Sequence, residues 1–146
     1  MPLDLVAWAA LGKWRDHASA RLPLEPYVNR RIDRLWSRIS GAGDMAAMDD
    51  DERHRLRIQI KKLRYALEFT EALHPPQDRR KFAMAVEDLQ EALGHLNDLV
   101  VARTLVAANA WPLEPFEPGN EERGFLREAD HATDRLRKIG AYWRNP

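Results

Sequence analysis

The feature that most constrains the fold of this chain is a row of apolar residues in its second half. Between residues 82 and 100 these residues recur at intervals of four, three, four, three and four: Phe82, Val86, Leu89, Leu93, Leu96 and Val100. This spacing is typical of a helix that packs in a bundle. A matching row precedes it, formed by Leu56, Ile60, Leu63 and Leu67. The two rows predict neighbouring helices that bury these residues against each other.

The rest of the chain fits the same fold class, an all-α antiparallel bundle of four to five helices. Prolines, glycines and acidic residues divide the 146 residues into five predicted helices. They span Leu3–Ala20, Pro26–Ser40, the stretch from the acidic run 49–51 to before Pro75, Pro76–Ala108, and Asn120–Ile139 with Asn120 as the N-cap. The acidic run favours a helix N-terminus. We expect one domain over residues 1–146, with the proline-rich loop at 112–119 packed across one end of the bundle.

Composition excludes several classes of protein. The chain has no cysteine, which excludes a disulfide scaffold, a cysteine nucleophile, an iron–sulfur cluster and a thiolate zinc site. Its histidines are not spaced for a metal, so we expect no metal and no cofactor. No stretch of about 18 apolar residues occurs, and the N-terminal residues do not resemble a signal peptide. We therefore expect a cytoplasmic protein without a membrane span.

The charges are balanced in number but not in position. The chain has 23 basic and 23 acidic residues, yet residues 53–64 contain six cations, one histidine and no acid. At 100° per residue, four of these side chains lie within about 80° of arc, on a different face from the apolar row of the same helix. We call them the basic row: His54, Arg57, Lys61 and Arg64. Lys62 lies on a separate side of that helix, and Arg34 and Arg38 belong to another one-sided row on the preceding helix.

Like charges stacked along a helix repel each other, so something should offset the repulsion. One hypothesis is that acids on the next helix, Glu87 and Asp98, pair with the cations. The other is that an external polyanion binds them. Gly94, inside a long helix, suggests a close helix–helix approach that would bring Asp98 to a cation. The charge pattern alone leaves both hypotheses open.

Two longer segments carry a family resemblance. Residues 54–69, HRLRIQIKKLRYALEF, resemble the histidine-led motif of the CHAD family, and residues 89–98, LQEALGHLND, resemble its second signature. The resemblance implies a helical domain of two related four-helix halves around a basic channel that binds inorganic polyphosphate. It implies that His54, Arg57, Lys61, Lys62 and Arg64 face polyphosphate, with weaker candidates in Arg34, Arg38 and Lys81. It also implies structural or network roles for Tyr65, Gln90, Gly94 and Asp98.

The resemblance covers the C-terminal half of such a domain, roughly residues 24–108, because no second His–Arg–Lys motif occurs upstream. We therefore expect that an N-terminal half or a second copy of the chain completes the channel, and that apolar surface is exposed where it packs. The family also implies a CYTH-type triphosphatase as a partner and polyphosphate granules as a location.

Other functions are weaker hypotheses. No nucleophile motif, glycine-rich phosphate loop or metal-binding carboxylate cluster is present, so we do not expect an enzyme. A histidine phosphotransfer module would need a glycine where Ile58 stands. A helical scaffold with internally paired charges remains an alternative. Nucleic acid is not expected as a partner, because Tyr65 alone is not a base-stacking platform.

Overall fold

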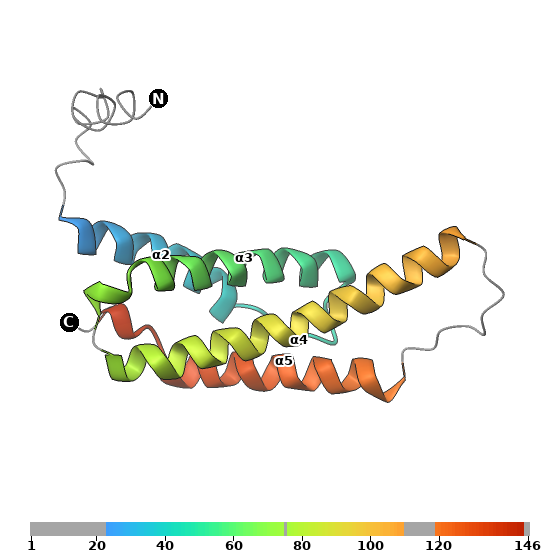
Figure 1. The fold of residues 1–146 in the computed structure, drawn as a ribbon. Helices are drawn as coiled ribbons and strands as arrows, with labels where there is room; N and C mark the ends of the chain where they lie inside the picture. Colours follow the sequence, from blue (N-terminus) through green and yellow to red (C-terminus); the bar gives the residue numbers. More distant parts are fainter. Residues whose placement is uncertain (1–22, 75, 110–118, 145–146) are drawn as a thin grey trace, which may run out of the picture.

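The computed structural model describes residues 23–74, 76–109 and 119–144. Within these ranges the chain forms four long helices: α2 (Leu24–Ser40), α3 (Asp50–Phe69), α4 (Pro76–Ala108) and α5 (Asn120–Ile139). Two short 3₁₀ helices, η3 (Glu71–Leu73) and η4 (Tyr142–Arg144), follow α3 and α5. The described residues contain no strand, and successive helices run antiparallel (Figure 1). The predicted all-α bundle is confirmed.

Most predicted helix bounds agree with the structure, and three need correction. Helix α3 ends at Phe69 and not just before Pro75, because the separate turn η3 follows it. Helix α2 begins at Leu24 rather than Pro26, because a proline in the first turn lacks only an N–H that has no helical partner there. Asn120 is the first residue of α5 and not its cap, since Gly119 occupies the N-cap position without a side-chain bond. The predicted helix 3–20 and most of the proline-rich loop lie outside the described residues.

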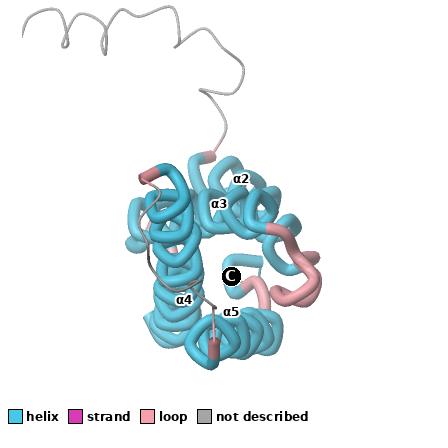
Figure 2. Tube along the Cα trace, turned by 90° about the vertical axis from the view of Figure 1, so that its right-hand side faces the viewer, coloured by secondary structure: helices cyan, strands magenta, loops and turns pink. Residues whose placement is uncertain are grey.

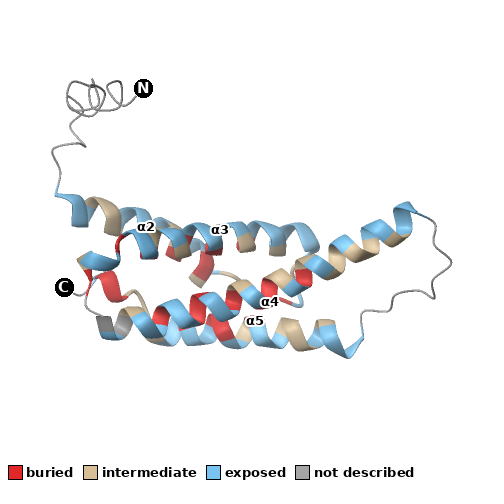
Figure 3. Ribbon diagram, in the orientation of Figure 1, coloured by how far each residue is buried: buried red, intermediate tan, exposed pale blue. Residues whose placement is uncertain are grey.

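The two apolar rows meet in the core as predicted. All four residues of the α3 row are buried, as are the first five of the α4 row (Figure 3). Val100 is only half-buried. It lies near the end of α4 that extends past its neighbours, where Val101 and Leu105 are 49% and 54% exposed (Figure 1). Helix α5 covers the other side of α4 with Ala129, Ala132 and Leu136.

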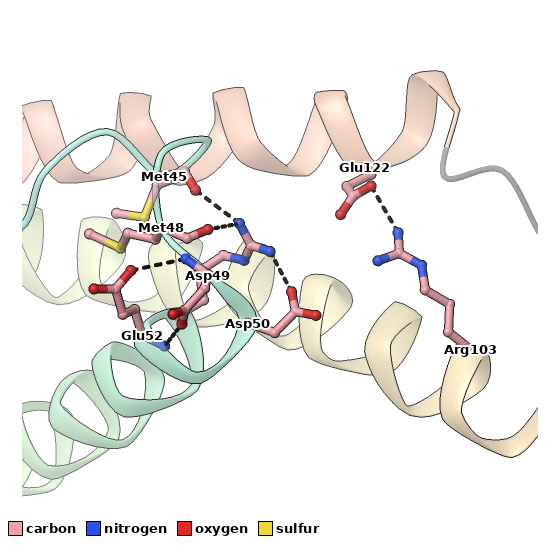
Figure 4. A network of polar contacts seen from close by, with 8 residues as sticks. Met45, Met48, Asp49, Asp50, Glu52, Arg103 and Glu122 are labelled. Carbon is pink, nitrogen blue, oxygen red and sulfur yellow. Dashed lines mark hydrogen bonds and ion pairs between the residues drawn. The ribbon is translucent and has the colours of Figure 1, made fainter. Parts of the chain in front are cut away.

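The start of α3 is fixed by a network of polar contacts (Figure 4). Asp49 Oδ1 accepts a hydrogen bond from the Glu52 N–H at 2.7 Å, and Glu52 Oε2 accepts one from the Asp49 N–H at 2.9 Å. This reciprocal capping box confirms the predicted role of the acidic run. The Arg53 guanidinium donates to the carbonyl oxygens of Met45 and Met48 at 3.0 and 2.7 Å. Arg53 is therefore a structural cation that ties the preceding loop to α3.

An aromatic cluster closes one end of the bundle. Phe82 packs edge-on against Trp36 and Trp143, with ring centroids 5.3 Å apart in both pairs. Trp143 Nε1 donates to Asp33 Oδ1 at 2.7 Å, and its carbonyl oxygen accepts a bond from Asn29 Nδ2 at 2.9 Å. The C-terminal turn thereby lies between α2 and α5, where those helices make little direct contact (Figure 2).

His74 is a buried titratable group beside this cluster. Its ring packs edge-on against Tyr142 with centroids 5.6 Å apart, and its Nε2 is buried without a hydrogen-bond partner among the described residues. Burial lowers the pKa of His74 below its ordinary value of 6.5; Glu25 opposes this shift and Arg79 adds to it. Burial also raises the pKa of Tyr142 to about 12.

Stability should therefore depend on pH through His74. In the unfolded chain the His74 imidazole binds a proton near pH 6.5, whereas in the folded protein it binds a proton only at lower pH. The free energy of unfolding therefore falls as the pH drops below 6.5. His74→Gln should flatten this dependence in denaturant titrations between pH 7.5 and 5. The matched variant His131→Gln, at an exposed site on α5, should leave it unchanged. Equal slopes in the parent and His74→Gln would contradict this expectation.

Candidate functional site

The position of the basic row follows from the buried side of α3. Leu56, Ile60, Leu63 and Leu67 are at most 6% exposed, which fixes the rotation of the helix about its axis. A neighbouring side of the helix carries the basic row, in which His54 and Lys61 are exposed and Arg57 and Arg64 are half-buried. The structure therefore brings these four predicted residues together on one side of α3, as the spacing required.

The basic row runs along the groove between α3 and α4. At one end, His54 Nδ1 lies 3.2 Å from Asn97 Oδ1 on α4. At the other end, Arg64 lines a cavity of about 300 Å³ together with Ala83, Val86 and Glu87 of α4. Because Arg57 and Lys61 lie between these two points on the same helix face, the row follows the edge of α3 that borders α4.

Most of the basic row has no acidic partner. Arg64 Nε lies 3.6 Å from Glu68 Oε1, which is an ion pair but too long for a hydrogen bond. Within the described part of the chain, neither His54, Arg57, Lys61 nor Lys62 forms an ion pair. The ion pairs present are elsewhere or local: Arg53–Asp50, Arg64–Glu68, Arg79–Glu71, Arg103–Glu122, Arg135–Asp88, Arg137–Asp134 and Arg144–Asp33.

The hypothesis that Glu87 and Asp98 pair with α3 is therefore wrong for the described residues. Glu87 lines the cavity beside Arg64 without an ion pair to it, and Asp98 is exposed and unpaired over the ranges described. At 100° per residue Asp98 lies on the outward side of α4, away from the edge that carries Asn97. The α4 acid that does pair, Asp88, bonds to Arg135 on α5.

Arg64 also has a buried donor, its Nε–H, that makes no hydrogen bond to a described residue. Gln90 Oε1 on α4 is likewise a buried acceptor without a described partner. Buried polar groups normally find hydrogen-bond partners, whereas the carboxylate nearest to Arg64 Nε, that of Glu68, lies beyond hydrogen-bond distance at 3.6 Å.

Two tyrosines support the cations, and sequence reasoning missed this role. The Tyr65 ring lies 5.2 Å from Arg64 Cζ and 6.0 Å from Lys61 Nζ, within the range of cation–π attraction. On α2, Arg31 Nη2 donates to the Tyr27 hydroxyl at 3.1 Å and its Cζ lies 5.5 Å from that ring. The spacing of four residues in Tyr27–Arg31 and Lys61–Tyr65 is the signal that predicts such pairs on a helix.

The weaker candidates separate into two groups. Arg34 and Arg38 are exposed on α2, on the side opposite its buried residues, and α2 packs against α3. They extend the positive surface but do not enter the α3–α4 groove. Lys81 stands seven and eleven residues before Asp88 and Ala92, which line a cavity between α4 and α5. Lys81 therefore lies on the α5 side of α4, away from the basic row.

Gly94 does not mark the close helix approach that its position suggested. A Cβ added to this residue would meet no atom within 4 Å other than its own helix. Gly94 lies on α4 between Gln90 and Asn97, on the side that borders the groove, and no atom of another described helix comes close to its Cβ position. Its conformational freedom therefore costs stability without a packing benefit inside the bundle.

We expect Gly94→Ala to raise the free energy of unfolding by about 0.5–1 kcal/mol, because alanine loses less backbone entropy in a helix. Chemical denaturation of the two proteins measures this difference. The reverse change at an exposed position of the same helix, Ala83→Gly, should lower stability by a similar amount. A loss of stability in Gly94→Ala would contradict the open environment of this residue.

Comparison with known proteins identifies the family. The family model described as "CHAD domain" matches residues 1–107, which include the basic row, the groove and both quoted motifs. The chain belongs to the CHAD domain family. The match begins earlier than residue 24, the approximate start of the resemblance, and it leaves α5 outside the matched region. Neither the curated proteins nor the solved structures contain a match to this chain.

The family is known for polyphosphate binding, and it is a family of binding domains rather than catalysts. Two further findings concern the described part of this CHAD chain. None of its helices is long and apolar enough to cross a membrane. No three of its histidine and acidic side chains are grouped so that they would hold a metal ion.

Proposed function

We propose that this CHAD protein binds inorganic polyphosphate along the groove between α3 and α4, without a catalytic step. The observation that supports the proposal most is the basic row: four side chains on one edge of α3, with only Arg64 paired to an acid among the described residues. In a chain of zero net charge, such a row is a local positive field that attracts a polyanion.

The side chains of the row suit a chain of phosphates. An arginine guanidinium binds two phosphate oxygens with parallel N–H bonds, and a lysine ammonium acts as a point charge that tolerates variable geometry. The four residues recur over three turns of helix at about 5.4 Å per turn, so contacts repeat along the groove. An extended polyanion would therefore meet several cations at once, whereas a single phosphate would meet only one or two.

The surroundings of His54 are the reason why we propose binding without a catalytic step. His54 Nδ1 faces the side-chain amide of Asn97, and no carboxylate of the described residues hydrogen-bonds to the ring. The imidazole therefore lacks the orienting acid that a nucleophile or general base usually has. We assign His54 a binding role at the end of the row.

A titration with long-chain polyphosphate tests the proposal, with orthophosphate and duplex DNA as comparison ligands at two salt concentrations. We expect binding to polyphosphate that weakens as salt increases, since each contact releases counterions. Orthophosphate should bind far more weakly, because it cannot span the row. Binding of DNA with equal affinity would show a surface that selects only for charge and would contradict a polyphosphate site.

The double variant Arg57→Glu/Lys61→Glu should bind polyphosphate at least a hundredfold more weakly, because each reversal removes a charge-assisted contact of about 1.5–3 kcal/mol. The matched control is Arg123→Glu/Arg127→Glu on α5, which makes the same change in net charge at two exposed cations. The control should lose affinity by no more than a few-fold. Equal losses of affinity in the two variants would show that binding depends on the net charge of the protein and not on the groove.

A further inference from the structure

The outer surface of α3 carries apolar side chains that no described residue covers. Ile58, Tyr65 and Phe69 are 36%, 50% and 88% exposed, and their spacing of seven and four residues places them on one side of the helix. Leu24, at the adjacent start of α2, is 61% exposed. We call these four residues the outer apolar face. Figure 3 shows the exposed outer sides of α2 and α3 that carry it.

Phe69 makes this face unusual for the surface of a soluble domain. A phenylalanine exposes a large apolar area to water when it is 88% accessible, and here it lies close in sequence to a second half-exposed aromatic residue, Tyr65. Contiguous exposed apolar residues usually mark a surface that another segment or another molecule covers. The face adjoins the basic row at Tyr65, whose ring lies 6.0 Å from Lys61 Nζ and 5.2 Å from Arg64 Cζ, and the row lies between this face and α4.

The N-terminal segment of the chain has the complementary pattern. Between residues 3 and 20, apolar residues recur at intervals of four, four, three and four: Leu3, Ala7, Leu11, Trp14 and Ala18. At 100° per residue they lie within about 80° of arc. Lys13, Arg15 and Asp16 lie outside that arc, as do the apolar residues Leu5, Val6 and Trp8 near the start of the segment. A helix with such a stripe needs an apolar surface to bury it.

The connection between this segment and the bundle is short. Three residues, 21–23, separate Ala20 from Leu24, the first residue of α2 and a member of the outer apolar face. Helices joined by connections of this length usually pack side by side and antiparallel. A helix of 18 residues spans about 27 Å, close to the 30 Å expected for the 20 residues of α3. The segment thus has the reach to cover the face from Leu24 and Phe69 to Ile58.

The family match adds independent support. The CHAD model begins its match at residue 1, so it includes this segment in the same domain as α2, α3 and α4. The tether also favours the segment over a second copy of the chain. A short connection holds the segment at an effective concentration in the millimolar range, above that of another molecule in ordinary solution.

We propose that residues 3–20 dock as an amphipathic helix on the outer apolar face, with Leu11 and Trp14 in the centre of the contact. Lys62 lies between Ile58 and Phe69 on this face, so the docked segment covers it. The α4 side of the basic row stays open. The docking does not depend on polyphosphate binding, and its test uses no polyphosphate.

The absence of cysteine in the chain permits a direct test with single-cysteine reporters. Lys62→Cys places a thiol inside the proposed contact, and Arg127→Cys places one at an exposed site on α5. In the full chain we expect iodoacetamide to modify Cys at position 62 at least tenfold more slowly than Cys at position 127. Adding Leu11→Asp/Trp14→Asp should raise the rate at position 62 to within twofold of that at 127 and leave the rate at 127 unchanged.

Two results would overturn the proposal. Equal rates at the two positions in the full chain would show that the face is open. A second copy would cover the face if modification at position 62 became slower as the protein concentration increased. In that case modification would also stay slow in Leu11→Asp/Trp14→Asp. Far-ultraviolet circular dichroism of every variant checks that the bundle remains folded.

A second measurement avoids changes in the contact itself. A nitroxide attached at Arg15→Cys lies outside the apolar stripe of the segment. We expect it to broaden the backbone amide resonances of residues 58–69 in α3 and to leave those of residues 120–139 in α5 sharp. Broadening confined to the N-terminal segment would also overturn the docking.

Discussion

The packing of α3 against α4 fixes the rotation of α3 about its axis, and the position of each of its cations follows from that rotation. Four apolar residues of α3 are buried, and full burial of such a side chain contributes about 1.5–3 kcal/mol. Successive members of the basic row repel one another by only about 0.2–0.5 kcal/mol per pair. Burial therefore outweighs the repulsion, and the helix keeps its cations in a row although few acids offset them.

The two sides of α4 serve different purposes. Its α5 side is closed by small and branched apolar residues, and one acid on that side, Asp88, bonds to Arg135. Its α3 side carries Asn97, Gln90 and the cavity that Arg64 lines, with polar atoms that have no described partner. Helix α5 lies outside the family match, yet it supplies part of the core. We infer that α5 stabilises α4 while α3 and α4 together carry the groove.

Much of the fold could be predicted because apolar spacing determines which side of each helix is buried. The same geometry placed His54, Arg57, Lys61 and Arg64 on one face, and applied to α4 it would have placed Lys81 on the α5 side. Contacts between helices were harder to predict. Periodicity gives the direction of a side chain but not the distance to its neighbour, so the expected pairing of Asp98 and the close approach at Gly94 were wrong.

Contacts between a loop and a helix could not be predicted from the sequence either. Arg53 belongs to the same cationic run as the basic row, yet its guanidinium donates to the Met45 and Met48 carbonyls. The spacing of the cations does not show that Arg53 has this structural role, because the positions of the two carbonyl groups depend on the path of the loop. The capping box at Asp49 and Glu52 was predictable in outline, since its residues lie three apart beside the helix start.

The most direct test of the binding site is to map it on the folded protein by nuclear magnetic resonance. Long-chain polyphosphate added at low salt should shift the amide resonances of the basic row and the Arg64 Nε–H signal, since that donor makes no hydrogen bond to a described residue. The resonances of α5 should change little. Shifts centred on α5, or shifts that follow surface exposure without preference for the α3–α4 groove, would contradict the account.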